Sequence, residues 1–113
     1  LEPAAMEELG LGPAQLLSRK PALIVVTNSL FGQTGRQRRA PGFGRQGSAI
    51  AGFDHLTGWP DREPVGPYAT ITDSLSSRYG ALLIAAALLA RSRGGGGPHI
   101  DVPQAETGVY SLS

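Results

Sequence analysis

The stretch ITDSLSSRYGALLIAAALLARSRGGGGPHIDVPQA, residues 71–105, predicts a long helix, its stop signal and a restart of regular structure. Its Ala and Leu residues are strong helix formers, and Arg91 and Arg93 suit the negative end of the helix dipole. The four glycines at 94–97 permit the positive φ angles at which helices end. The alternation in His99-Ile-Asp101 then predicts a short surface strand, followed by a last helix.

The start of this long helix carries the residue of greatest chemical interest, Asp73. Either Thr72 or Asp73 is suited to N-cap the helix, and capping alone explains an Asp there. A helix N-terminus also favours an ionised carboxylate, the state that a nucleophile requires. The pattern is therefore compatible with a cap, a nucleophile or both. The expected apolar face of the helix consists of Leu75, Tyr79, Leu82, Leu83, Ala86 and Leu89.

The preceding residues predict an α/β arrangement. Helices are expected over residues 4–9 and 13–19, where good helix formers are separated by Gly10 and Gly12. The continuous run of residues 22–27, Ala-Leu-Ile-Val-Val-Thr, is typical of a strand buried on both faces of a parallel sheet. The apolar residues Ala49, Ile50, Phe53 and Leu56 are spaced for one further helix, which Gly58 is placed to end.

Residues 28–47 predict a long loop rich in Gly, Gln and Arg. Loops of this length without structure of their own are often functional or disordered. Arg36, Arg38 and Arg39, with Arg45, could bind phosphate, of a nucleotide-containing ligand or of RNA, or form a solvated charged surface. The run Gly42-Phe-Gly44-Arg-Gln-Gly47 fits a dinucleotide-binding pattern, but it does not directly follow a strand. A glycine cluster before a helix explains that run adequately.

Composition narrows the function classes. The 113 residues include 41% hydrophobic residues, which suits a single domain. The absence of cysteine excludes disulfides, thiolate metal sites and a Cys nucleophile. A net charge of +1 creates no strong electrostatic attraction to nucleic acid or anionic membranes. The longest apolar stretch, residues 79–90, is shorter than the roughly 18 residues of a membrane span. His55 and His99 lack the further ligands of a zinc site.

Five motifs in order resemble the class III CoA-transferase family, which includes formyl-CoA and carnitine CoA-transferases and acyl-CoA racemases. They are Leu9-Gly-Leu-Gly12, Pro21-Ala-Leu-Ile24, Phe31-Gly-Gln-Thr-Gly35, the segment around Asp73, and residues 91–102. The resemblance covers nearly the whole chain. It implies that residues 1–113 are an internal segment of the Rossmann-like large domain, without the preceding βα units and the later small domain. The chain opens on Leu1 without a secretory signal, so we expect a piece of a longer cytoplasmic protein.

The resemblance also implies a site and a reaction. Asp73 would be the acyl-accepting nucleophile, forming a mixed anhydride and then an aspartyl-CoA thioester without a metal. Coenzyme A, as the acyl-CoA substrate, would contact Arg36, Arg38 and Arg39 and the glycines Gly32 and Gly35. Acyl-CoA and a carboxylic acid are the expected partners, and family members form interlocked homodimers. The segment alone is expected to be inactive.

Two departures from the family pattern bear on the reaction type. The racemase branch has a His-Asp pair where this chain has Phe43-Gly44, so a two-base racemase would lack one base. Some transferases carry an acid at the second of these positions as well. Arg36 also stands where the family usually has Pro. Transfer is favoured over racemisation, and the alternatives are a racemase of the same family or a non-catalytic truncated paralogue.

Overall fold

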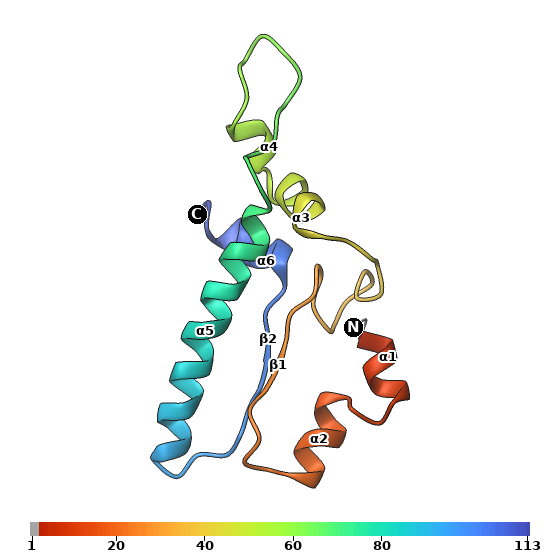
Figure 1. Cartoon of the computed structure of the whole chain (residues 1–113), viewed down its shortest axis with the longest axis vertical. Helices are drawn as coiled ribbons and strands as arrows, with labels where there is room; N and C mark the ends of the chain where they lie inside the picture. Colours follow the sequence, from red (N-terminus) through yellow and green to blue (C-terminus); the bar gives the residue numbers. More distant parts are fainter. Residues whose placement is uncertain (1–2) are drawn as a thin grey trace.

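The computed structural model describes residues 3–113, which form helices around one pair of strands (Figure 1). In chain order the elements are α1 (Pro3–Glu8), α2 (Pro13–Arg19), β1 (Val25–Thr27), α3 (Gly44–Ala51), α4 (Phe53–Leu56), α5 (Ile71–Ser92), β2 (His99–Asp101) and α6 (Gln104–Tyr110). The predicted order of helices and strands is confirmed. The buried apolar side chains are Val25, Leu30, Phe53, Ala87, Val102 and Ala105.

The two strands pair in parallel, with Val25 opposite His99 and Thr27 opposite Asp101. The predicted α/β class with short parallel strands is therefore confirmed. The long helix α5 lies on one side of the strands in Figure 1, and α1 and α2 lie on the other side. The first strand is shorter than the predicted run of residues 22–27 and is not buried on both faces, because the Val26 side chain is 38% exposed.

Helix α5 begins earlier than the sequence indicated. Its N-cap is Thr70, which makes no side-chain capping hydrogen bond, and Asp73 lies in the first turn. The prediction that Thr72 or Asp73 caps the helix is therefore wrong. The Thr72 hydroxyl instead donates to the Gly44 carbonyl at 2.8 Å, which is a contact between α5 and α3 and not a capping hydrogen bond. Asp73 still lies where the helix dipole favours a negative charge.

The buried stripe of α5 differs from the predicted apolar face. It consists of the small residues Thr72, Ser76, Gly80 and Ala87. Small side chains allow neighbouring elements to approach the helix closely, whereas Leu82, Leu83 and Leu89 are 65%, 41% and 52% exposed. Val26 is also exposed, whereas Val25 is buried.

The predicted single helix around residues 49–56 is divided at Gly52, which adopts φ +98° between α3 and α4. Helix α3 also starts at Gly44, inside the expected loop. Of the four predicted apolar positions only Phe53 is buried, whereas Ile50 and Leu56 are 51% and 68% exposed. The buried face of α3 is Gly44, Gly47 and Ser48, because this helix packs through its small residues against α5 and α6.

Gly80 provides a test of the packing of α5. A Cβ added at Gly80 would meet no atom within 4 Å, and the residue lies in the helix interior. We expect Gly80→Ala to raise the free energy of unfolding by about 0.5–1 kcal/mol, because alanine is the better helix former. Urea unfolding of the protein that contains this chain measures the change. A lower stability would show that another segment packs against Gly80.

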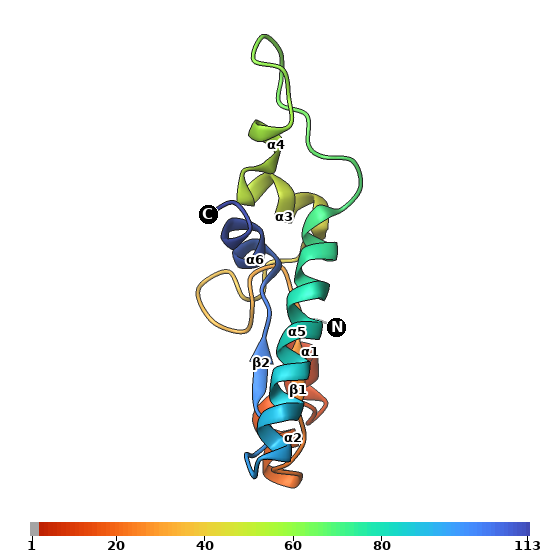
Figure 2. The ribbon, with the colours of Figure 1, turned by 90° about the vertical axis from the view of Figure 1, so that its left-hand side faces the viewer.

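The described chain is thin and elongated, as the two perpendicular views show (Figures 1 and 2). Its principal extents are 55 × 32 × 20 Å and its radius of gyration is 16.3 Å. A compact domain of this length would have a radius of gyration of about 13 Å. Within residues 3–113, no helix is both long enough and apolar enough to cross a membrane.

Candidate functional site

The chemically useful side chains gather beyond the carboxyl ends of the two strands. β1 leads into Asn28, Ser29 and Leu30, and β2 leads through Val102 and Pro103 into Gln104, the first residue of α6. The backbone pairing continues past the strands, because Gln104 N donates to Ser29 O at 2.9 Å. Ligands of open parallel sheets bind at this edge. The first turn of α5 brings Asp73 to the same place.

Asp73 and Gln104 are in direct contact. The Nε2 amide of Gln104 donates to Oδ1 of Asp73 at 2.6 Å. Asp73 is partly buried, and no arginine or lysine within residues 3–113 forms an ion pair with it. One carboxylate oxygen of Asp73 is therefore held by a neutral amide donor, and the carboxylate is not neutralised by a neighbouring cation in this part of the chain.

Gly44 provides the space that the other oxygen of Asp73 occupies. A Cβ at Gly44 would overlap Oδ2 of Asp73 and would lie 2.9 Å from Thr70 Cβ. Gly47, one turn later, faces Thr72 in the same way. Gly44 and Gly47 thus serve close packing of α3 against the start of α5, whereas Gly42 lies against Leu30. The run has a structural explanation, but its last two glycines lie within the helix rather than before it. A side chain at position 44 would therefore displace Asp73.

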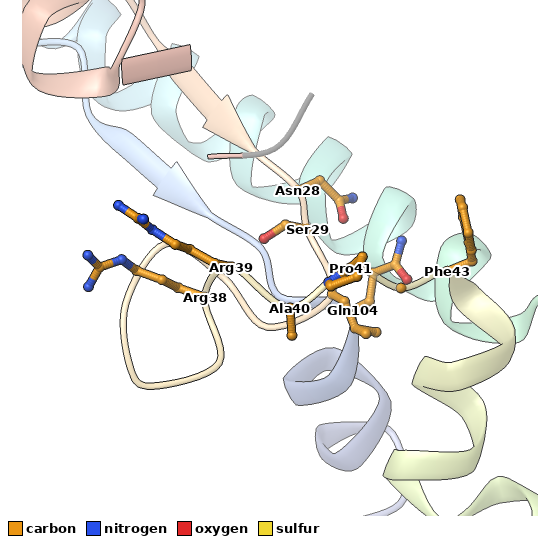
Figure 3. Close-up of a pocket in the computed structure, with 10 residues that line it drawn as sticks. Asn28, Ser29, Arg38, Arg39, Ala40, Pro41, Phe43 and Gln104 are labelled. Carbon is orange, nitrogen blue, oxygen red and sulfur yellow. The ribbon is translucent and has the colours of Figure 1, made fainter. Parts of the chain in front are cut away.

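A hollow of about 390 Å³ opens beside Gln104 (Figure 3). Gln104 and Ser29 line it together with Asn28, Leu30 and residues 38–43, and Asp73 is not among the lining residues. Within the described chain, Gln104 Oε1 and Ser29 Oγ are buried yet have no hydrogen-bond partner. Buried polar atoms are rarely left unsatisfied, so two residues with such atoms at one hollow indicate a place for a polar partner.

The structure divides the predicted coenzyme-binding residues between two places. Arg38 and Arg39 line the hollow beside Gln104, and Figure 3 shows their side chains extending away from Gln104. Both residues are exposed. Gly35 and Arg36 line a separate hollow of about 670 Å³ with Phe31 and Glu106. None of the three arginines forms an ion pair within residues 3–113. Their guanidinium groups are thus available to an anion.

Gly32 has a structural role of its own. It adopts φ +80°, and a Cβ there would lie 2.8 Å from both Asp101 Oδ2 and Pro103 Cγ. The same Asp101 oxygen accepts from Gln33 N at 2.7 Å, and Asp101 Oδ1 accepts from the Thr27 hydroxyl at 2.8 Å. Asp101 therefore ties the loop after β1 to the end of β2. The predicted surface strand, β2, therefore holds this loop in place.

Sequence reasoning did not single out Gln104 or Ser29 as functional residues. A signal for both was present, because each follows a predicted strand at the edge where parallel sheets bind ligands. The contact between Gln104 and Asp73 joins residues that are distant in the sequence. Only the packing of α6 against α5 brings them together.

Sequence comparison shows which family this chain belongs to. Residues 1–113 match the description of CoA-transferase family III. The chain is 42% identical over 108 residues to the succinyl-CoA–D-citramalate CoA-transferase of Chloroflexus aurantiacus, covering 96% of the chain and 26% of that protein. It is 38% identical over 104 residues to the acetyl-CoA:oxalate CoA-transferase of Acetobacter aceti, covering 88% of the chain and 26% of that protein. The chain thus spans about a quarter of the length of these relatives.

Solved structures show the same arrangement of elements. A CaiB/BaiF family protein from Brucella suis superposes with a TM-score of 0.93 at 29% identity, over 100% of this chain and 30% of its own. The protein Rv3272 from Mycobacterium tuberculosis superposes with a TM-score of 0.88 at 31% identity, over 99% of this chain and 32% of its own. The strand pair and its surrounding helices are therefore a shared substructure of larger chains.

Proposed function

The chain belongs to CoA-transferase family III, and from this we propose that it carries the nucleophile of an enzyme that moves CoA from an acyl-CoA donor to a carboxylic acid. The curated relatives described above are CoA-transferases that use succinyl-CoA or acetyl-CoA. Asp73 is the proposed nucleophile. The observation that carries the proposal is the hydrogen bond that joins its carboxylate to Gln104, because Gln104 lines a hollow and has an unsatisfied buried oxygen.

The proposed reaction proceeds through two covalent intermediates on Asp73. A carboxylate oxygen attacks the thioester carbonyl, the C–S bond breaks, and CoA thiolate leaves a mixed anhydride. The thiolate then attacks Cγ of Asp73, releasing the donor acid and forming an aspartyl-CoA thioester. The acceptor carboxylate attacks Cγ and expels the thiolate, which attacks the new acyl carbon and regenerates Asp73. Each attack creates an oxyanion that hydrogen-bond donors must stabilise.

Chemical trapping tests the proposed role of Asp73. The full-length protein that contains this chain is incubated with a panel of acyl-CoA thioesters and then with hydroxylamine or borohydride. Peptide mass spectrometry is expected to locate the modification on Asp73 and to show which thioester is the donor. An unmodified Asp73 across the panel would contradict the covalent mechanism. It would favour the racemase or the non-catalytic alternative.

The missing side chain at position 44 supports transfer over racemisation. The racemase branch places a His-Asp pair at positions 43 and 44, whereas this chain has Phe43, which is 75% exposed, and Gly44. Neither can accept a proton. Exchange of the substrate α-proton into D₂O without acyl transfer would favour the racemase instead.

Arg38 and Arg39 are proposed to bind the phosphates of CoA. Both line the hollow beside Gln104 and neither is paired with an acid within residues 3–113. We expect the double variant Arg38→Ala/Arg39→Ala to raise the KM for acyl-CoA about tenfold with a small change in kcat, because charge-assisted contacts to phosphate are lost. Steady-state kinetics with acyl-CoA and with its 3′-dephospho analogue measure the effect.

Arg62→Ala is the matched control, because Arg62 is exposed and pairs with its neighbour Asp61. An unchanged KM in the double variant would remove Arg38 and Arg39 from the CoA site. Arg36, Gly32 and Gly35 would then remain the candidates, through the second hollow that Gly35 and Arg36 line. Salt-sensitive binding of polynucleotide by the unmodified protein would instead support the RNA-binding alternative.

We further propose that the chain is part of a Rossmann-like large domain within a longer, homodimeric and interlocked enzyme. The exposed leucines of α5 and the elongated shape support this, because a helix that is apolar all round is normally buried. The segment alone is expected to turn over no acyl-CoA. Size-exclusion chromatography with light scattering on the full-length protein tests the dimer, and a monomer would contradict it.

A further inference from the structure

The carboxamide of Gln104 faces two ways. Its Nε2 donates to Asp73 Oδ1 at 2.6 Å, and its Oε1 is buried without a partner among the described residues. The orientation of the amide is set by the carboxylate, because an amide oxygen placed against a carboxylate oxygen would be repelled. The donor therefore faces Asp73 and the acceptor points away from it.

The two oxygens of Asp73 have different surroundings. Oδ1 is held by Gln104, whereas Oδ2 lies against Gly44, where no side chain is present. An oxygen that already accepts a strong hydrogen bond is the poorer nucleophile, so Oδ2 is the oxygen that attacks the thioester. Oδ1 then remains as the carbonyl oxygen of both the anhydride and the aspartyl-CoA thioester.

We infer that Gln104 is a catalytic residue that stabilises the oxyanion formed on Asp73 itself, a role that rests on the proposed function of Asp73. When the CoA thiolate attacks Cγ, the C=O electron pair moves onto Oδ1, which lies 2.6 Å from Nε2. Collapse of this tetrahedral centre breaks the bond from Cγ to Oδ2 and releases the donor acid as its carboxylate. The same donor acts when the acceptor carboxylate attacks the aspartyl-CoA thioester.

The Oε1 atom of Gln104 and the Ser29 hydroxyl both lack a hydrogen-bond partner among the described residues. Their backbones are linked by the hydrogen bond from Gln104 N to Ser29 O at 2.9 Å, and both residues line the hollow. Gln104 Oε1 can only accept, so it requires an N–H or O–H donor from outside the described residues. Such a donor would hold the amide rigidly while Nε2 stabilises the charge on Oδ1.

Substitution of Gln104 tests the inference in the full-length protein. Gln104→Met keeps the length and volume of the side chain but removes the donor, and Gln104→Glu keeps the shape but places a carboxylate against Asp73. We expect the rate constant for forming aspartyl-CoA to fall about 100-fold in both variants, the effect of removing one oxyanion donor. The KM for the donor acyl-CoA is expected to change less than about threefold, because the interaction strengthens only in the transition state. Rapid quench and mass spectrometry of the Asp73 peptide give the rate.

Gln15→Leu is the matched control. It also removes a glutamine hydrogen bond, the contact from Gly12 N to Gln15 Oε1 at 2.9 Å, but in α2. Formation of aspartyl-CoA at the unmodified rate in both Gln104 variants would overturn the inference and leave Asp73 as the nucleophile. Loss of donor binding along with the rate in both variants would also overturn it, in favour of a purely structural Gln104. Absence of any adduct on Asp73 in the unmodified protein would instead contradict the proposed function.

Discussion

Asp73→Asn is expected to abolish CoA transfer, lowering kcat by at least about 10⁴-fold, the scale seen when a covalent nucleophile is removed. The amide has the shape of the carboxylate and can still accept from Gln104, so the fold and the binding of acyl-CoA are expected to remain. It cannot attack a thioester, and no anhydride can form. Steady-state transfer rates and binding titrations with a donor acyl-CoA measure the two properties separately.

Asp61→Asn is the control for this variant, because Asp61 is exposed and contacts only its neighbour Arg62 within the described chain. It removes one carboxylate and is expected to leave transfer unchanged. Full activity of Asp73→Asn would show that another carboxylate carries the acyl group. Loss of acyl-CoA binding together with activity would point to a structural role for Asp73 instead.

Gly44→Ala is expected to lower kcat about 100-fold or more while leaving the protein folded. The added Cβ would occupy the space of Asp73 Oδ2 and would lie 2.9 Å from Thr70 Cβ, so the carboxylate must swing away. A displacement of about 1 Å from the reactive geometry is sufficient for a loss of this size. Overpacking of a tight contact adds a destabilisation of about 1–3 kcal/mol.

The matched control is Gly80→Ala, the same exchange on the helix that carries Asp73, at a position where an added Cβ would meet no atom of the described residues within 4 Å apart from its own helix backbone. It is expected to retain full transfer activity. Measurement of kcat, KM and thermal stability for both variants separates displacement of Asp73 from general destabilisation. Wild-type kcat in Gly44→Ala would show that Asp73 reacts from a position other than the one in this structure.

The sequence predicted most of the elements, and its failures share one cause. It indicated the long helix, the parallel strands and the last helix, since these follow from local helix formers, breakers and β-branched runs. It misplaced the buried faces of α3 and α5 by assuming that large apolar residues face inward. In the structure the contacts are made by Gly44, Gly47, Thr72 and Ser76, and several leucines remain exposed. Close approach of helices selects small side chains, which periodicity of large ones does not reveal.

For the candidate site too, the sequence determined only a part and the tertiary structure decided the rest. By itself the sequence determined that one carboxylate, Asp73, lies near the start of a long helix, because helix formation depends on neighbouring residues. Only the tertiary structure decided that Gln104 hydrogen-bonds this carboxylate, that Gly44 leaves room for it, and that Arg38 and Arg36 line different hollows. These relations join residues far apart in the chain. They are fixed by how α3 and α6 pack on α5, which no local pattern specifies.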